Sequence, residues 1–107
     1  MTRQEKEENS KKSFSFTSSL SKEEIKKLMN SVSWYHTFEI NGERQTETRT
    51  SLKYQMWVAQ GIPEDLSGKT VLDIGTADGF YSFLAEHRGA KRVLALDYMK
   101  FPGFDIA

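Results

Sequence analysis

Apolar residues recur with a helical period in the stretch that follows residue 20. Four of them fall at positions i, i+3, i+4 and i+7 of one helical face, namely Ile25, Leu28, Met29 and Val32. Ser21 precedes this stripe, and Glu24 follows three residues later, which is the sequence pattern of a capping box. The pattern predicts a helix that begins after Ser21 and packs through its apolar face.

The period changes to two in residues 34–40, WYHTFEI, where large apolar residues alternate with polar ones. Such alternation is typical of a half-buried strand. Asn41-Gly42 follows, and this dipeptide is a strong hairpin signal because both central positions of a type I′ turn need positive φ. We therefore expect a hairpin whose polar second strand covers 43–48, or else an extended loop with a strand-like pattern.

A second helix is predicted over residues 50–60. Leu52, Met56 and Ala59 mark one apolar face, which Trp57 widens. Gly61 suits the position just after the helix, and a proline two residues later ends it. Residues 63–69, PEDLSGK, then indicate a turn.

From Thr70 onward the chain alternates a strand, a glycine loop, a helix and a strand. Residues 71–74 form a nearly continuous apolar run, which is typical of a parallel strand buried on both faces. A helical repeat follows and ends at Gly89, with a stripe made of Phe80, Phe83, Leu84 and His87. A second apolar run covers residues 93–96. This order predicts an α/β fold with one βαβ unit.

The loop between the first strand and the helix carries the candidate chemistry. Gly75 and Gly79 bracket Thr76 in this loop, and glycine lets the backbone approach a ligand closely. Ligands of open α/β sheets bind outside the carboxyl ends of the strands, where this loop lies. Asp97 ends the second strand and is placed to accept hydrogen bonds from ribose hydroxyls.

The same loop distinguishes between cofactor classes. The middle glycine of a dinucleotide fingerprint is missing, and Asp73 and Asp78 place carboxylates in the strand and in the loop. These carboxylates would repel a pyrophosphate and would favour a ligand with a cationic part. No Gly-Lys-Ser/Thr follows the glycines, which excludes a Walker A loop.

Composition narrows the function classes further. The 107 residues include 15 Lys and Arg and 15 Asp and Glu, and this balance argues against a strongly basic nucleic-acid binder. There is no cysteine, which excludes disulfides, thiolate zinc sites and thiol chemistry. No apolar run reaches the ~20 residues of a membrane span. We expect a cytoplasmic protein with no metal site and no membrane contact.

The segment VLDIGTADG, residues 71–79, resembles the first motif of class I S-adenosylmethionine-dependent methyltransferases. LALD, residues 94–97, is similar to the acidic end of their second strand. The resemblance implies S-adenosyl-L-methionine as cofactor and a partial Rossmann-like fold. It also implies which residues bind that cofactor. The loop residues would be Asp73, Gly75, Thr76 and Gly79. Asp97 would hold the ribose. Asp78 and Phe80 lie in or beside the loop, and no catalytic residue can be named.

A narrower resemblance extends upstream of this motif. Residues 34–40 and 63–83 are similar to methyltransferase-like proteins related to the enzymes that modify the tRNA wobble uridine at its 5-oxygen. This similarity implies methylation of a tRNA or of a small molecule. From the residues alone, we expect His36 and His87 to be structural. Trp34, Tyr35 and Trp57 are able to stack on a base, but we expect them to pack.

The domain organisation follows from these assignments. Residues 1–13, of which seven of the first 12 are charged, predict a disordered tail. Residues 14–69 form an N-terminal helical cap region, and residues 70–107 begin a cofactor-binding domain. A class I methyltransferase core resembles a seven-stranded sheet, whereas residues 70–107 supply two strands and one helix.

We therefore expect an N-terminal fragment of a longer enzyme that is inactive by itself. One alternative is a non-catalytic fragment or partner subunit that no longer binds the cofactor productively. Another is a small protein whose sheet is completed by a dimer or by a partner chain, since two parallel strands alone leave unpaired edges.

Overall fold

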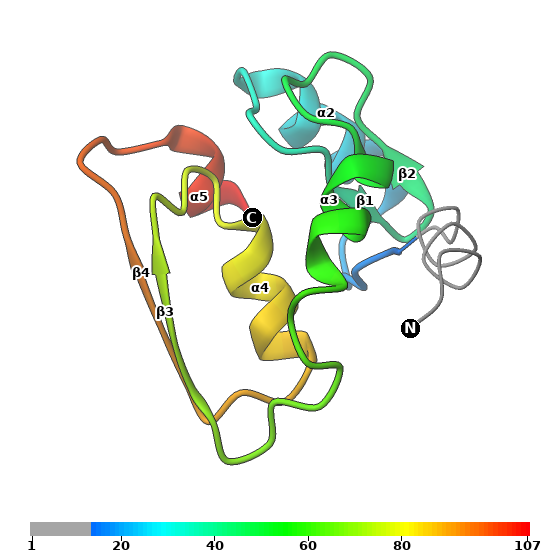
Figure 1. The fold of residues 1–107 in the computed structure, drawn as a ribbon. Helices are drawn as coiled ribbons and strands as arrows, with labels where there is room; N and C mark the ends of the chain where they lie inside the picture. The colour runs from blue at the N-terminus through cyan, green and yellow to red at the C-terminus, as the bar shows by residue number, and fades with distance from the viewer. Residues whose placement is uncertain (1–13) are drawn as a thin grey trace. The chain divides into compact units, whose positions relative to one another are not determined.

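The structure is a computed structural model that describes residues 14–107, so the predicted tail at 1–13 lies outside the described residues (Figure 1). The chain divides into two compact units, one up to Gln60 and one from Gly61 to Ala107. The elements of the first unit are α2 (Lys22–Ser31), β1 (Glu39–Ile40), β2 (Glu43–Arg44) and α3 (Leu52–Ala59). Those of the second are β3 (Thr70–Ile74), α4 (Phe80–His87), β4 (Arg92–Leu96) and α5 (Pro102–Ile106). The α/β class and the single parallel β3–α4–β4 unit are confirmed.

Helix α2 begins where the sequence predicts. The Ser21 side chain accepts a hydrogen bond from the backbone N–H of Glu24 at 3.2 Å, which satisfies one of the unpaired amides at the start of the helix. Ile25 is buried, and Leu28 and Met29 are half-buried on the same face. The apolar stripe therefore fixes which face of α2 packs.

The hairpin around Asn41-Gly42 is also confirmed, but its second strand covers only Glu43–Arg44 of the predicted 43–48. Asn41 and Gly42 have φ angles of 51° and 83°, and β1 pairs antiparallel with β2. The predicted strand over residues 34–40 is wrong except at its end, because only Glu39–Ile40 is a strand. His36, Thr37 and Phe38 are all buried, so the alternation in the sequence does not correspond to alternate burial.

A buried glutamine on α3 pairs with the backbone of this segment. Gln55 has no exposed surface, and its Oε1 accepts hydrogen bonds from the backbone N–H of Thr37 at 2.8 Å and from Thr50 Oγ1 at 2.7 Å. Its Nε2 donates to the backbone carbonyl of Thr37 at 2.9 Å. The amide side chain thus satisfies both backbone groups that a neighbouring strand would otherwise pair.

Helix α3 itself matches the prediction, with two exceptions. Ser51 caps it by accepting a hydrogen bond from the Tyr54 N–H at 3.1 Å, and Leu52 and Ala59 are buried. Trp57, however, is 54% exposed and does not widen the apolar face. Gly61 is not among the glycines with positive φ, so its conformational freedom is not what ends the helix.

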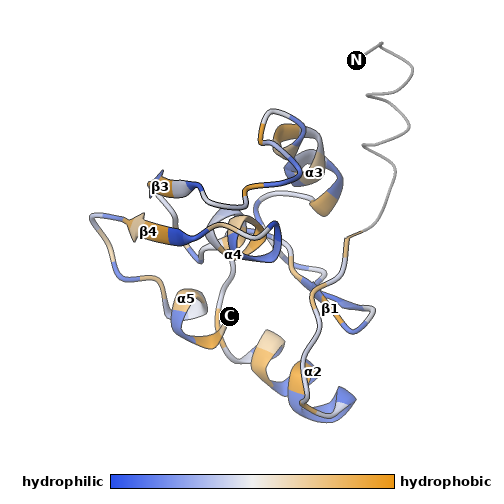
Figure 2. Ribbon diagram, turned by 90° about the horizontal axis from the view of Figure 1, so that it is seen from below, coloured by the Kyte–Doolittle hydropathy of each residue, from blue (hydrophilic) through white to orange (hydrophobic). Residues whose placement is uncertain are grey.

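In the second unit, β3 and β4 are parallel, in a register that pairs Thr70 with Arg92 and Ile74 with Leu96. Helix α4 lies along one side of both strands (Figures 1 and 2). Gly89 ends α4 with a φ of 90°, and its N–H donates to Glu86 O while that of Ala90 donates to Ala85 O. This pair of bonds is a Schellman motif, as the glycine signal predicts.

The other side of this sheet is open. The sequence predicted strands buried on both faces, and this prediction is wrong. Four large apolar residues are between about half and three-quarters exposed, namely Leu72, Ile74, Leu94 and Leu96. Their period-two alternation with half-buried neighbours shows that α4 covers one face only. Within the second unit, residues 61–107, no second layer packs on the opposite face.

The end of α4 and the start of α5 show features that the sequence did not predict. His87, at the end of α4, is exposed rather than part of the apolar stripe, which ends at Leu84. Helix α5 is a five-residue turn of helix that starts at Pro102, a residue suited to the first helical position.

None of the helices in residues 14–107 has the length and apolar character needed to cross a membrane.

Replacing Gln55 tests its role in the first unit. We expect Gln55→Leu to lower the free energy of unfolding by about 2–4 kcal/mol, because it leaves the buried N–H and carbonyl of Thr37 without partners. Lys53→Ala, on the exposed side of the same helix, serves as the control and should change stability by less than about 0.5 kcal/mol. Urea denaturation measures both. Equal stability of Gln55→Leu and the unmodified chain would contradict this role.

The one-sided sheet predicts an asymmetry between its faces. Leu84→Ala should destabilise the protein by about 2–5 kcal/mol, since Leu84 is 1% exposed beneath the sheet. Ile74→Thr should change stability by less than about 0.5 kcal/mol, because Ile74 is 77% exposed and Thr keeps the β-branch. Thermal unfolding followed by circular dichroism compares the two. A large loss in Ile74→Thr would mean that this face is covered in solution.

Candidate functional site

The loop that joins β3 to α4 is tied to the end of β4. The N–H groups of Gly75 and Thr76 donate to the Leu96 carbonyl at 2.7 and 3.0 Å. The next N–H, that of Ala77, donates to Asp97 Oδ2 at 2.9 Å. Three consecutive amides therefore hold the loop at the carboxyl end of the neighbouring strand.

The loop adopts a left-handed backbone conformation at three positions. Gly75, Ala77 and Gly79 have φ angles of 76°, 51° and 88°. Glycine adopts such angles easily, whereas an alanine there costs roughly 1–2 kcal/mol. The bond from Ala77 to Asp97 compensates for part of this cost. The helix then starts at once, because the N–H of Phe83 donates to the carbonyl of Gly79 at 2.9 Å.

Behind the loop, Asp73 contacts the start of α4. Its Oδ2 accepts a hydrogen bond from Ser82 Oγ at 2.7 Å, and Ser82 Oγ lies 3.1 Å from Thr76 Oγ1. Thr76 and Ser82 are both buried. The carboxylate of Asp73 thus links strand, loop and helix instead of facing the space in front of the loop.

Asp97 combines this structural role with an open position. Hydrogen bonds from the N–H of Ala77 and then from that of Met99 lower the pKa of the Asp97 carboxyl below its ordinary value. Because the pKa is lower in the folded protein, the associated stabilisation is present above the ordinary carboxyl pKa. It is lost as the pH falls through the lowered pKa. Asp97 is therefore a carboxylate at neutral pH.

A pocket of about 160 Å³ lies in front of the loop. Thr76, Ala77 and Asp97 line one part of it, and Lys100 and Phe104 line another. Pockets that bury a small ligand usually measure about 300–1,000 Å³. This pocket therefore has room for part of a nucleoside-containing cofactor, next to the residue expected to hold a ribose.

The ring of Phe104 on α5 fills the space directly against Gly79. A Cβ atom added at Gly79 would lie 2.8 Å from the Phe104 ring and 2.9 Å from that of Phe83. The two phenylalanine rings pack together with centroids 5.6 Å apart. Gly79 is thus required both by its positive φ and by the aromatic ring that covers it.

The structure separates the five predicted cofactor residues into groups. Thr76 and Asp97 line the pocket, Gly75 and Gly79 shape the loop, and Asp73 lies behind it. The other two residues beside the loop, Asp78 and Phe80, are buried and do not line the pocket. The sequence analysis missed the roles of three further residues: Ala77, Ser82 and Phe104. No signal in the sequence marks Ala77 or Ser82, and Phe104 contacts the loop from 25 residues away along the chain.

Of the histidine and aromatic candidates in the first unit, His36 and Trp34 are packed as expected, whereas Tyr35 and Trp57 are 42% and 54% exposed. His36 is buried with its ring 5.0 Å from that of Tyr35, and Trp34 is buried with its ring 5.5 Å from that of Phe38. Trp34 Nε1 also donates to the backbone carbonyl of Met29 at 2.9 Å. Among residues 14–107, no group of three or more acidic, histidine or cysteine side chains is arranged to hold a metal ion.

Comparisons with known proteins do not assign this chain to a family. No family model matches the chain, and no curated protein or solved structure is significantly similar to it.

Proposed function

We propose that this chain carries the first part of the S-adenosyl-L-methionine site of a class I methyltransferase. The observation that supports the proposal best is the pocket at the carboxyl ends of β3 and β4, which Thr76, Ala77 and Asp97 line. Open parallel sheets bind nucleotide-like ligands at this end. The resemblance of residues 71–79 and 94–97 to the methyltransferase motifs points to the same site.

The hydrogen bonds of Asp97 leave capacity for a ribose. Its Oδ2 accepts from Ala77 at 2.9 Å, and its Oδ1 accepts from Met99 at 3.2 Å. A carboxylate has about four lone-pair positions, and the backbone of Tyr98 also interacts with this one, so about one or two positions remain. A vicinal diol that donates two hydrogen bonds matches this remaining capacity, and a ribose presents such a diol.

The electrostatics favour a cationic cofactor over a phosphorylated one. The amides of residues 75–77 already donate to Leu96 and Asp97, so they do not form the cradle of bare N–H groups that a pyrophosphate needs. Asp73 and Asp97 add negative charge behind and beside the loop. When bound, S-adenosyl-L-methionine would supply an electrophilic methyl group on a positively charged sulfonium.

The methyl acceptor in this proposal is a tRNA or a small molecule. Methyl transfer depends mainly on placing the acceptor in line with the sulfonium, which is a matter of proximity and orientation. We assign no catalytic residue. We propose that the loop and Asp97 bind and orient the cofactor.

The open face of the β3–β4 sheet favours a second candidate. Its exposed leucine and isoleucine side chains are what a subunit interface or a missing layer would cover. In this reading the chain is a non-catalytic fragment or partner subunit that docks through the sheet. The two candidates differ in whether the pocket binds cofactor.

Variants of Asp97 test the cofactor site. Asp97→Asn keeps an oxygen that can accept from the Ala77 N–H but removes the charge, whereas Asp97→Ala removes both. We expect Asp97→Asn to weaken the binding of S-adenosyl-L-methionine by about tenfold and Asp97→Ala to abolish it. Isothermal titration calorimetry at neutral pH measures both. Binding should also weaken as the pH falls through the lowered pKa of Asp97.

Glu86→Gln, on the exposed side of α4, is the matched control and should bind as the unmodified chain does. If the unmodified chain gives no heat of binding at millimolar cofactor, the non-catalytic reading is favoured. If all three variants bind equally, Asp97 does not hold the ribose.

Phe104 provides a second test, because its ring occupies the space against Gly79. We expect Phe104→Ala to raise the affinity for S-adenosyl-L-methionine by up to about tenfold, since it removes a side chain that competes for the site. Ile106→Ala, on the same short helix, should leave the affinity unchanged. The same calorimetric titration measures this effect. An affinity that falls in Phe104→Ala would show that the ring supports the cofactor site instead of obstructing it.

A further inference from the structure

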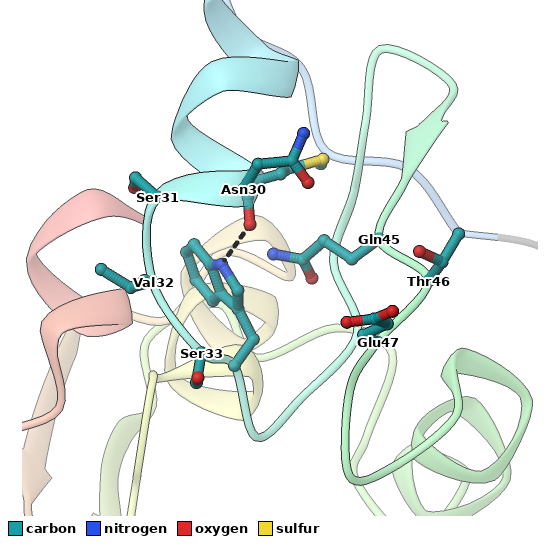
Figure 3. A pocket seen from close by; sticks show the side chains of 9 residues that line it. Asn30, Ser31, Val32, Ser33, Gln45, Thr46 and Glu47 are labelled. Atoms are coloured by element: carbon teal, nitrogen blue, oxygen red, sulfur yellow. Dashed lines mark hydrogen bonds between the residues drawn. The ribbon is translucent and has the colours of Figure 1, made fainter.

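A second pocket lies entirely within the first unit, between the end of α2 and the segment that follows β2 (Figure 3). Its volume is about 480 Å³, which is within the range of roughly 300–1,000 Å³ for pockets that bind small ligands. Asn30, Ser33 and Trp34 line one side, and Gln45 and Glu47 line the other. None of these residues belongs to the proposed cofactor site, so a test of one site does not depend on the outcome for the other.

Gln45 directs an unused hydrogen-bond donor into this pocket. Its side-chain Oε1 accepts from the backbone N–H of Phe38 at 2.7 Å. Because an N–H must face an oxygen, this bond fixes which end of the amide is the nitrogen. Gln45 is only 9% exposed, and its Nε2 is buried without an acceptor among the residues that the structure describes. Figure 3 shows this amide pointing toward the middle of the pocket.

A buried donor without a partner is unfavourable, and nearly all such groups in folded proteins are satisfied by protein, water or ligand. The hydrogen bond to Phe38 N–H prevents the Gln45 side chain from turning away without leaving that amide unpaired. The first unit thus holds in place a donor for which residues 14–107 supply no acceptor. An acceptor atom of a ligand, or an ordered water, fits this position.

The other polar groups of the pocket restrict which ligands can bind in it. Glu47 is the one charged residue among those that line it, and Figure 3 shows its carboxylate on the same side as the Gln45 amide. A carboxylate repels phosphates and accepts hydrogen bonds from N–H donors. Trp34 also lines the pocket, although it is largely buried, and its Nε1 donates to the Met29 carbonyl at 2.9 Å. The best match is a flat, uncharged group with a carbonyl next to an N–H.

We propose that this pocket binds a small uncharged ligand through a cyclic amide edge, such as the edge of a lactam nucleobase. The carbonyl of the ligand accepts from Gln45 Nε2, and its adjacent N–H donates to Glu47. A nucleoside or a simple cyclic amide presents this edge, whereas a nucleotide adds a phosphate that Glu47 disfavours.

Nuclear magnetic resonance titration tests the proposal on the full chain. The probes are uridine, which carries the complete edge, and 2-pyrrolidinone, which carries it without a ribose. We expect saturable shifts of the Gln45 side-chain amide and the Trp34 indole N–H with at least one probe. Shifts with both support the amide edge as the shared determinant, and shifts with uridine alone support a nucleoside. 3-Methyluridine, whose donor is blocked, should bind about tenfold more weakly than uridine.

Variants distinguish the two hydrogen bonds. Gln45→Glu keeps the oxygen that accepts from Phe38 but replaces the donor, and it should weaken binding by about tenfold or more. Glu47→Gln changes an exposed side chain that tolerates substitution, so it remains informative if Gln45→Glu does not fold. It should weaken binding by a similar factor. Glu23→Gln, exposed on α2 outside the pocket, is the control and should bind normally.

Two results would overturn the proposal. One is a Gln45 amide that shows contact with a bound water and does not shift with either probe at millimolar concentration. The other is binding that is equally strong for 3-methyluridine and uridine and that is unchanged in Glu47→Gln. In the first case solvent satisfies the donor of Gln45, and in the second the ligand does not donate to Glu47.

Discussion

The second unit depends on three consecutive backbone amides that donate to the end of β4. Gly75, Thr76 and Ala77 direct their N–H groups to the carbonyl of Leu96 and the carboxylate of Asp97. These bonds extend the pairing of β3 and β4 into the loop and position the first turn of α4. They also decide the chemistry of the site. Amides that already bond within the protein cannot cradle a phosphate, so what remains for a ligand is the carboxylate.

In the first unit, side chains satisfy backbone groups that lie outside the regular strands. Residues 35–38 precede β1 without belonging to a strand, and Gln55 satisfies the backbone of Thr37 from a neighbouring helix. Gln45 does the same for the N–H of Phe38, but only its oxygen is used. A glutamine amide has an acceptor and donors, and burying it for the acceptor alone leaves the nitrogen unsatisfied. This difference is why Gln55 is a core residue and Gln45 marks a pocket.

Local signals in the sequence predicted local features well. Ser21 and Ser51 cap helices, Asn41-Gly42 forms the hairpin turn, and Gly89 ends α4, because each signal acts within a few residues. Features set by distant neighbours were not predictable. The burial of Gln55 depends on a segment 18 residues away, and the ring that covers Gly79 comes from Phe104. The apolar run in β3 predicted two covered faces of the sheet, but an apolar run alone does not specify how many layers pack against a strand.

The sequence indicated which residues surround the candidate site, but not the contacts that each of them makes. The motif named Asp73 and Asp97 alike, and both sit at the ends of adjacent strands. Asp73 bonds with Ser82 behind the loop, whereas Asp97 faces the pocket while holding Ala77 in a left-handed conformation. A ligand that bonds to Asp97 therefore acts on the group that positions the loop. If the proposed ligand bonds to Asp97, its binding and the order of the loop would be coupled through this carboxylate, whereas a change at Asp73 would act through its bond with Ser82 on α4.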